Sequence, residues 1–238
     1  MTARAAPLAG YPAVMFGALS AVLLAGVWAV SAQVYPDAAV PALLFSAIVG
    51  VAGAGLLRHY AHPSLGACNV VTLLRAALVC LIAGAVAAPP VTDAAAWALC
   101  AIAALALAMD GLDGWLARRS GLTSGFGARF DMEIDALLGA VLSLIVWQVG
   151  PGAGVAVLLL GFMRYLFVGA TWIWPWLAAP LPDSLRRKTV CVIQIAALIA
   201  LLMPVLPSGV FGLIAYSAAA LLGWSFAVDI THLRRERA

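Results

Sequence analysis

The sequence predicts an all-α integral membrane protein, and three observations lead to that fold class. Hydrophobic residues make up 65% of the chain and charged residues 10%, and the mean hydropathy is +1.08. A soluble domain has about 45–50% apolar and about 25% charged residues, so a soluble fold is excluded. The apolar residues are gathered into long stretches, and the basic residues lie in the connections between alternate stretches.

Eight stretches are long enough to cross a bilayer as helices, which takes about 20 mostly apolar residues. They are residues 13–33, 39–57, 70–89, 94–116, 129–149, 152–173, 188–204 and 209–229. Proline, glycine and aspartate separate them, for example at Pro89-Pro90. The first stretch ends in Ala29-Val30-Ser31-Ala32, which would suit signal peptidase, but its length and single preceding arginine favour a retained span.

Positive charge sets the orientation of these spans, because basic residues stay on the cytoplasmic side of a membrane. With the N-terminus in the cytoplasm, eleven of the 13 Lys and Arg residues lie in cytoplasmic segments. Arg75 lies within two turns of that side, and Arg164 alone lies well inside a span. The opposite connections contain no Lys or Arg. We therefore expect a multi-pass protein of a bacterial-type inner membrane with both ends in the cytoplasm.

Four aspartates lie at the cytoplasmic ends of the fourth and fifth predicted spans: Asp110, Asp113, Asp131 and Asp135. A spacing of i, i+3, i+4, i+7 places one set on a single helical face: Asp110, Asp113, Gly114 and Ala117. A spacing of i, i+4, i+8 places a second set on one face of the next helix: Gly127, Asp131 and Asp135. An antiparallel helix pair can turn both faces toward one cavity.

Carboxylates crowded at a membrane boundary repel one another, and divalent cations are the usual remedy. Two Mg²⁺ or Mn²⁺ ions about 3.5–4 Å apart can clamp a phosphoryl centre, and Arg118 adds a cation suited to phosphate oxygens. A carboxylate that does not bind metal can act as general base toward a hydroxyl. For any one aspartate, a charge paired with a nearby arginine is the alternative, and this alternative is preferred for Glu133, which lies off the shared face.

The pattern D-x2-D-G-x2-A-R-x8-G-x3-D-x3-D is matched at every fixed position: Asp110, Asp113, Gly114, Ala117, Arg118, Gly127, Asp131 and Asp135. In this motif the chain resembles the CDP-alcohol phosphotransferases. The resemblance implies that Asp110, Asp113 and Asp131 ligate a di-metal centre. It implies Asp135 as the general base, and Asp135 also counts among the candidate metal residues. Gly114, Ala117 and Gly127 would line the nucleotide, and Arg118 would approach the diphosphate.

The same resemblance extends to the start of the third span and to the domain organisation. Asn69, Thr72 and Arg75 look like the N-x2-T-x2-R opening of many members, which borders the nucleotide site; a helix cap and a snorkelling arginine are the alternative. The family core has six transmembrane helices, which implies an N-terminal two-helix extension over residues 1–62 and a catalytic domain over 63–238. Arg164 should face a polar cavity, where it would bind a substrate phosphate or pair with an aspartate.

The reaction implied is transfer of a phosphatidyl group from CDP-diacylglycerol to a small polar alcohol, with release of CMP. The expected partners are these two substrates and membrane lipids, with a homodimer possible and no nucleic acid. One alternative reverses the roles, with a CDP-choline-type donor and a lipid alcohol acceptor. A divalent-cation transporter would explain the carboxylates but not Gly114, Ala117, Gly127 and Arg118. The sequence does not identify the acceptor.

Overall fold

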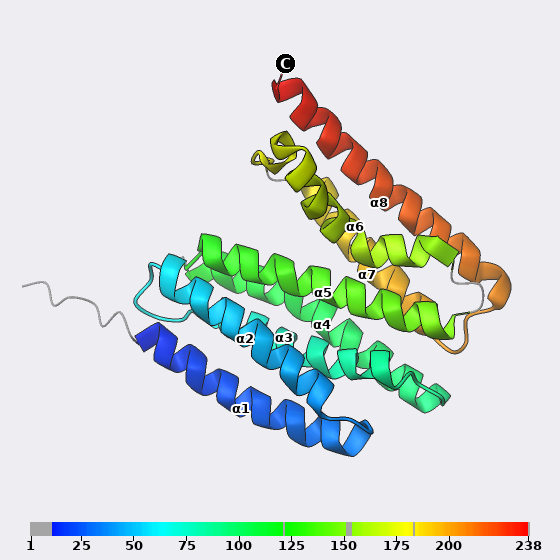
Figure 1. Cartoon of the computed structure of the whole chain (residues 1–238), viewed down its shortest axis with the longest axis horizontal. Coiled ribbons are helices and arrows are strands. Elements are labelled where there is room, and N and C mark those ends of the chain that lie inside the picture. The colour runs from blue at the N-terminus through cyan, green and yellow to red at the C-terminus, as the bar shows by residue number, and fades with distance from the viewer. Residues whose placement is uncertain (1–10, 121, 151–153, 183, 238) are drawn as a thin grey trace, which may run out of the picture. The chain divides into compact units, whose positions relative to one another are not determined.

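A computed structural model describes residues 11–120, 122–150, 154–182 and 184–237 of the chain. Within these ranges, the side chains of five residues lie outside the description: Asp113, Trp115, Ala117, Arg118 and Arg237. The described residues form helices joined by short connections and contain no strand (Figure 1). The predicted all-α class is therefore confirmed.

Eight α-helices and one short 3-10 helix follow one another in the described ranges. They are α1 (Tyr11–Val34), α2 (Ala39–His59), α3 (Ala67–Ala87), α4 (Asp93–Ser120), α5 (Gly125–Val149), α6 (Gly154–Ile173), η1 (Pro175–Ala178), α7 (Leu185–Leu202) and α8 (Ser208–Arg237). Each α-helix corresponds to one predicted span, although α3 and α7 each end two residues before their span does. Seven of them are long and apolar enough to cross a membrane. The remaining one, α7, carries Arg186, Arg187 and Lys188 near its start.

The chain folds into two compact units. Unit 1 runs to residue 88 and includes residues 105–135, whereas unit 2 contains residues 89–104 and 136 onward. Helices α4 and α5 therefore each contribute residues to both units. The ends of α4 and α5 that carry the four aspartates of the sequence motif belong to unit 1.

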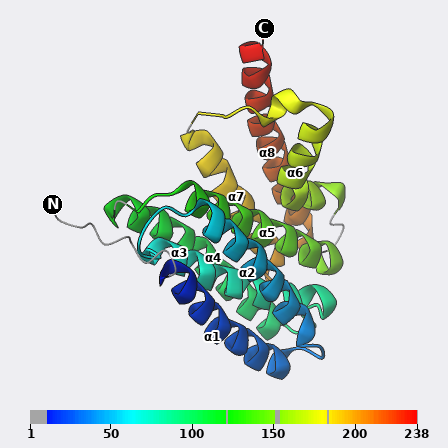
Figure 2. The same cartoon turned by 60° about the vertical axis from the view of Figure 1, so that its left-hand side comes forward.

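The central helix of unit 1 is α3, against which α1 and α2 both pack (Figures 1 and 2). Its side chains Leu73, Val79 and Ile82 are fully buried, which accounts for the mainly apolar composition of the helix. Tyr35, just after α1, lies against Gly84 so closely that a Cβ there would be 2.4 Å from the ring. The Tyr35 hydroxyl donates a hydrogen bond of 2.7 Å to the Leu81 carbonyl.

Unit 2 is built on α6, α7 and α8, with η1 packed on α6 and α8. Leu160 and Leu198 are fully buried in its core. The amide of Gln194, on α7, donates a hydrogen bond to the Leu160 carbonyl on α6. Pro175 at the first position of η1 breaks the helical path after α6, because proline has no N–H to continue it. Hydrogen bonds from Arg186 to Ser225 and Asp229 hold the basic start of α7 beside the C-terminal half of α8.

Candidate functional site

Three of the four predicted aspartates come together in unit 1. Asp110 lies on α4, and Asp131 and Asp135 lie one turn apart on α5. One carboxylate oxygen from each lies within 4.8 Å of the others. Each side chain is partly buried, with between 22% and 32% of its surface exposed. The i, i+4 spacing on α5 thus places both of its carboxylates beside the one from α4, as the sequence predicts.

A fully buried arginine from α3 lies among these carboxylates. The Arg75 guanidinium donates hydrogen bonds to Asp131 and Asp135, and its Nη1 is 3.3 Å from Asp110 Oδ1. Its Nε donates to the Ala106 carbonyl of α4 at 3.1 Å. An unpaired charge in a bilayer costs at least about 2.5 kcal/mol, so a buried arginine needs such partners. This set of four side chains contains three negative charges and one positive charge.

The first turn of α5 is fixed by a serine cap and by a close approach from α3. Ser124 Oγ accepts a hydrogen bond of 3.0 Å from the Gly127 N–H, which satisfies a backbone donor that the helix leaves open. A Cβ at Gly127 would lie 2.9 Å from Asn69 Oδ1 and 3.2 Å from Ser124 Oγ. Asn69 is buried. A glycine at this position lets the two helices bring Asn69 against the motif.

The other residues that the sequence analysis singles out lie on α3, α4, α5 and α6. Thr72 is buried on α3, and its hydroxyl donates 3.0 Å to the Cys68 carbonyl. Gly114 is partly buried on α4, and Glu133 is exposed on α5. The side chains of Asp113, Ala117 and Arg118 lie outside the described residues. Arg164 is partly buried on α6 and belongs to unit 2.

Sequence comparison identifies the family of the chain. Residues 65–228 match the family model described as CDP-alcohol phosphatidyltransferase. The chain belongs to the CDP-alcohol phosphatidyltransferase family. Comparison with curated proteins and comparison with solved structures each gave no match. The family assignment makes the chain a transferase of phosphate-containing groups, in a family that generally depends on divalent metals.

The match begins just before α3, so α1 and α2 lie outside the CDP-alcohol phosphatidyltransferase region. The loop that joins α2 to α3 nevertheless contacts motif residues of unit 1. Tyr60 accepts a hydrogen bond of 3.2 Å from Asn69 Nδ2, and His62 Nε2 lies 3.1 Å from the Thr123 carbonyl, just before α5. Nothing in the sequence motif points to Tyr60. Ser124, in contrast, has the N-cap signature of a helix start.

Unit 2 of this CDP-alcohol phosphatidyltransferase contains a second charged cluster that the sequence did not predict. Arg186 donates to the Asp229 carboxylate and to the Ser225 carbonyl and hydroxyl. Arg187 donates to the same carboxylate at 3.4 Å and to the Pro182 carbonyl. Asp229 is 7% exposed. A carboxylate at the end of an apolar helix is itself a signal for such a cluster.

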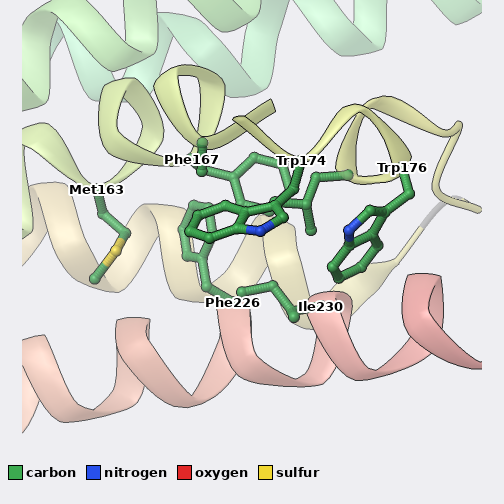
Figure 3. Close-up of a pocket in the computed structure, with 8 residues that line it drawn as sticks. Met163, Phe167, Trp174, Trp176, Phe226 and Ile230 are labelled. Carbon is green, nitrogen blue, oxygen red and sulfur yellow. The ribbon is translucent and has the colours of Figure 1, made fainter. Parts of the chain in front are cut away.

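An apolar pocket of about 340 Å³ lies between α6, η1 and α8 in unit 2. Figure 3 shows Phe167, Trp174 and Phe226 gathered there, with Trp176 and Ile230 beside them. The rings of Phe167 and Phe226 have centroids 5.4 Å apart. The sequence favours Trp172, Trp174 and Trp176 as an interfacial aromatic belt. Trp172 is 85% exposed, whereas the other two line the pocket.

Proposed function

We propose that this transferase moves a phosphatidyl group from CDP-diacylglycerol to the hydroxyl of a small polar alcohol and releases CMP. The observation that carries the proposal is the group of three aspartates around buried Arg75, in a chain of this family. A diphosphate is the most highly charged part of the donor, and divalent cations held by the aspartates would bind it.

The donor atoms suit Mg²⁺ or Mn²⁺, which prefer carboxylate oxygens. Arg75 offsets one of the three negative charges of the cluster and leaves an excess that a divalent cation would neutralise. We assign Asp110, Asp113 and Asp131 as the residues that would hold two such ions, with Asp135 beside them. When bound, the ions would neutralise the diphosphate oxygens and stabilise the leaving group.

Asp135 is the proposed general base. Its ion pair with Arg75 holds a negative carboxylate oxygen in place, which is the form that accepts a proton. The acceptor hydroxyl loses its proton to Asp135, and its oxygen forms a new ester bond to the phosphorus of the phosphatidyl group. The bond from that phosphorus to the CMP oxygen breaks, and CMP leaves with the bonding electrons. The protein mainly positions these groups and neutralises their charge.

The other motif residues bind the donor in this proposal. Gly114, Ala117 and Gly127 line the nucleotide, Asn69 and Thr72 border it, and Arg118 approaches the diphosphate. Arg164 would bind the acceptor or a substrate phosphate.

The distribution of basic residues supports a site that faces the cytoplasm of a bacterial-type inner membrane. A homodimer stays a prediction.

The test uses purified full-length protein in lipid nanodiscs with Mg²⁺ or Mn²⁺. The protein is given CDP-diacylglycerol and, in turn, glycerol 3-phosphate, inositol phosphate, serine and choline. We expect CMP release with one acceptor and a new phosphodiester lipid by mass spectrometry. Turnover only with CDP-choline and diacylglycerol would reverse donor and acceptor. No CMP from any pair, together with divalent-cation flux into sealed vesicles, would replace the transferase with a transporter.

A further inference from the structure

The loop between α2 and α3 begins outside the family region, at Tyr60, and contacts residues inside that region. Tyr60 precedes the matched residues 65–228, yet it is hydrogen-bonded to Asn69 on α3 and packs edge-on against Phe126 on α5, with ring centroids 5.8 Å apart. Both partners lie beside the motif, since Phe126 precedes Gly127 directly. A residue from outside the family region therefore reaches the proposed nucleotide end of the site.

The hydrogen bonds of Tyr60 fix which way the Asn69 amide points. A tyrosine hydroxyl has one proton to donate, and Tyr60 donates it to the Ser64 carbonyl at 2.8 Å. Toward Asn69 the hydroxyl can therefore only accept, so the amide turns its NH₂ group to Tyr60. The carbonyl oxygen of Asn69 then faces the position of Gly127, which it approaches closely.

The ring of Tyr60 is held by a row of aromatic side chains that extends to α1. Phe126 stacks on Phe130 with centroids 5.8 Å apart, and Phe130 meets Phe16 of α1 edge-on at 6.4 Å. All three phenylalanines are buried. On α5, Phe126 and Phe130 directly precede the motif residues Gly127 and Asp131. One face of α5 thus packs on the N-terminal helices while the neighbouring face carries the site.

We propose that Tyr60 is a positioning residue for the CDP-bearing donor and acts by orienting the Asn69 amide. The inference rests on the proposed function, because it assumes that the nucleotide borders Asn69. It assigns a role in the site to the segment that precedes the family region. Burial raises the pKa of the Tyr60 phenol, Cys68 adds to the rise, and the hydrogen bond from Asn69 lowers it. The hydroxyl therefore stays protonated at neutral pH and keeps donating to Ser64.

The test is Tyr60→Phe in the full-length protein, which keeps the ring packing and removes only the hydroxyl. We expect the Kd and KM for CDP-diacylglycerol to rise about fivefold, the equivalent of one hydrogen bond, with kcat unchanged within about twofold. Tyr35→Phe is the matched control, because it removes a partly buried tyrosine hydroxyl of unit 1 that bonds the Leu81 carbonyl instead. We expect wild-type Kd and KM from it.

A double substitution separates positioning from general support of the fold. In an Asn69→Ala background, Tyr60→Phe should have no further effect on the donor Kd, because the amide that it orients is gone. Equal donor Kd values for wild type and Tyr60→Phe, or full additivity with Asn69→Ala, would overturn the inference and leave the proposed function intact. Failure of the wild-type protein to bind CDP-diacylglycerol at all would overturn both.

Discussion

Unit 1 and unit 2 each contain a cluster of arginine and aspartate side chains, and the two clusters have opposite proportions. In unit 1, one arginine, Arg75, contacts three carboxylates. In unit 2, two arginines, Arg186 and Arg187, share the single carboxylate of Asp229. Negative charge is in excess in the first cluster and positive charge in the second.

The two clusters also differ in how their charges are satisfied. Arg186 and Arg187 donate hydrogen bonds to the backbone carbonyls of Ser225 and Pro182 in addition to Asp229, so oxygen atoms of the backbone satisfy their N–H groups. Backbone carbonyls cannot satisfy carboxylates in this way, because an ionised carboxylate only accepts hydrogen bonds and needs N–H or O–H donors or cations. Crowded carboxylates around one buried arginine therefore favour a cation site, whereas the cluster of unit 2 acts as a link between α7 and α8. The ratio of charges, and not their presence, separates the two.

The largest expected effect comes from the proposed base of unit 1. Asp135→Asn keeps the size of the side chain but removes its ability to accept a proton. We expect kcat to fall by about 10²–10⁴-fold, the usual contribution of a general base. The Kd for CDP-diacylglycerol should change far less, because the other carboxylates persist. Steady-state CMP release and equilibrium donor binding give the two values.

Glu133→Gln is the matched control for Asp135→Asn. It removes a carboxylate two residues earlier on the same helix, and Glu133 is exposed and off the site face. We expect wild-type kcat. Equal kcat for wild type and Asp135→Asn would remove the base assignment and leave Asp135 as a partner of Arg75.

The next largest effect tests the excess of negative charge. Arg75→Gln leaves three carboxylates together without the buried cation, and breaking such a buried pair costs about 3–5 kcal/mol of unfolding free energy. Mg²⁺ should restore part of this loss, because a dication can take over the neutralisation. Reaction of the buried Cys80 and Cys100 thiols with a fluorescent maleimide during heating reports unfolding.

Asp229→Asn is the counterpart in unit 2. Arg186 keeps its bonds to Ser225, so we expect a smaller loss of about 1–3 kcal/mol. Mg²⁺ should not restore it, because the charge left over is positive. If Mg²⁺ raises the thermal midpoints of both variants by the same amount, the distinction between the clusters fails.

The sequence was sufficient to predict the helices and the way Asp110 of α4 comes together with Asp131 and Asp135 of α5. Long apolar runs set the order of the helices, and the i, i+4 spacing of Asp131 and Asp135 needs only helical geometry. The helix ends were less accurate. Helix α4 continues through the motif to Ser120, and α5 begins at Gly125, directly after the Ser124 cap. Polar residues form these helix ends, so hydropathy alone places the boundaries too early or too late.

The contacts between distant segments could not be predicted from the sequence. Arg75 lies 35 residues before Asp110 and 60 before Asp135, and only the packing of unit 1 brings its guanidinium among them. Tyr60 lies in a loop that the motif does not include, and it meets Asn69 of α3 and Phe126 of α5 through the packing of unit 1. Asp229 is the last residue of the predicted span 209–229, and it meets Arg186 because α7 and α8 pack together. In each case tertiary packing, and not local spacing, determines the partner.

The smallest expected effect tests how closely α3 and α5 fit together at the motif. Gly127→Ala adds a Cβ that would lie 2.9 Å from Asn69 Oδ1, so the amide must move. The fold itself should tolerate the change, since alanine is favoured over glycine in helices by about 1 kcal/mol. We expect the KM for CDP-diacylglycerol to rise about fivefold while the thermal midpoint stays the same or increases.

Gly125→Ala is the control for this last comparison, because it makes the same substitution two residues earlier in the same helix. A Cβ at Gly125 meets nothing within 4 Å, so the alanine gains the same helical preference without moving Asn69. We expect its KM to match that of the wild type. A rise in KM for both variants would attribute the effect to the stiffness of the first turn of α5. A rise for Gly127→Ala alone would locate it at the contact between Gly127 and Asn69, whose amide is bonded to Tyr60 from outside the family region.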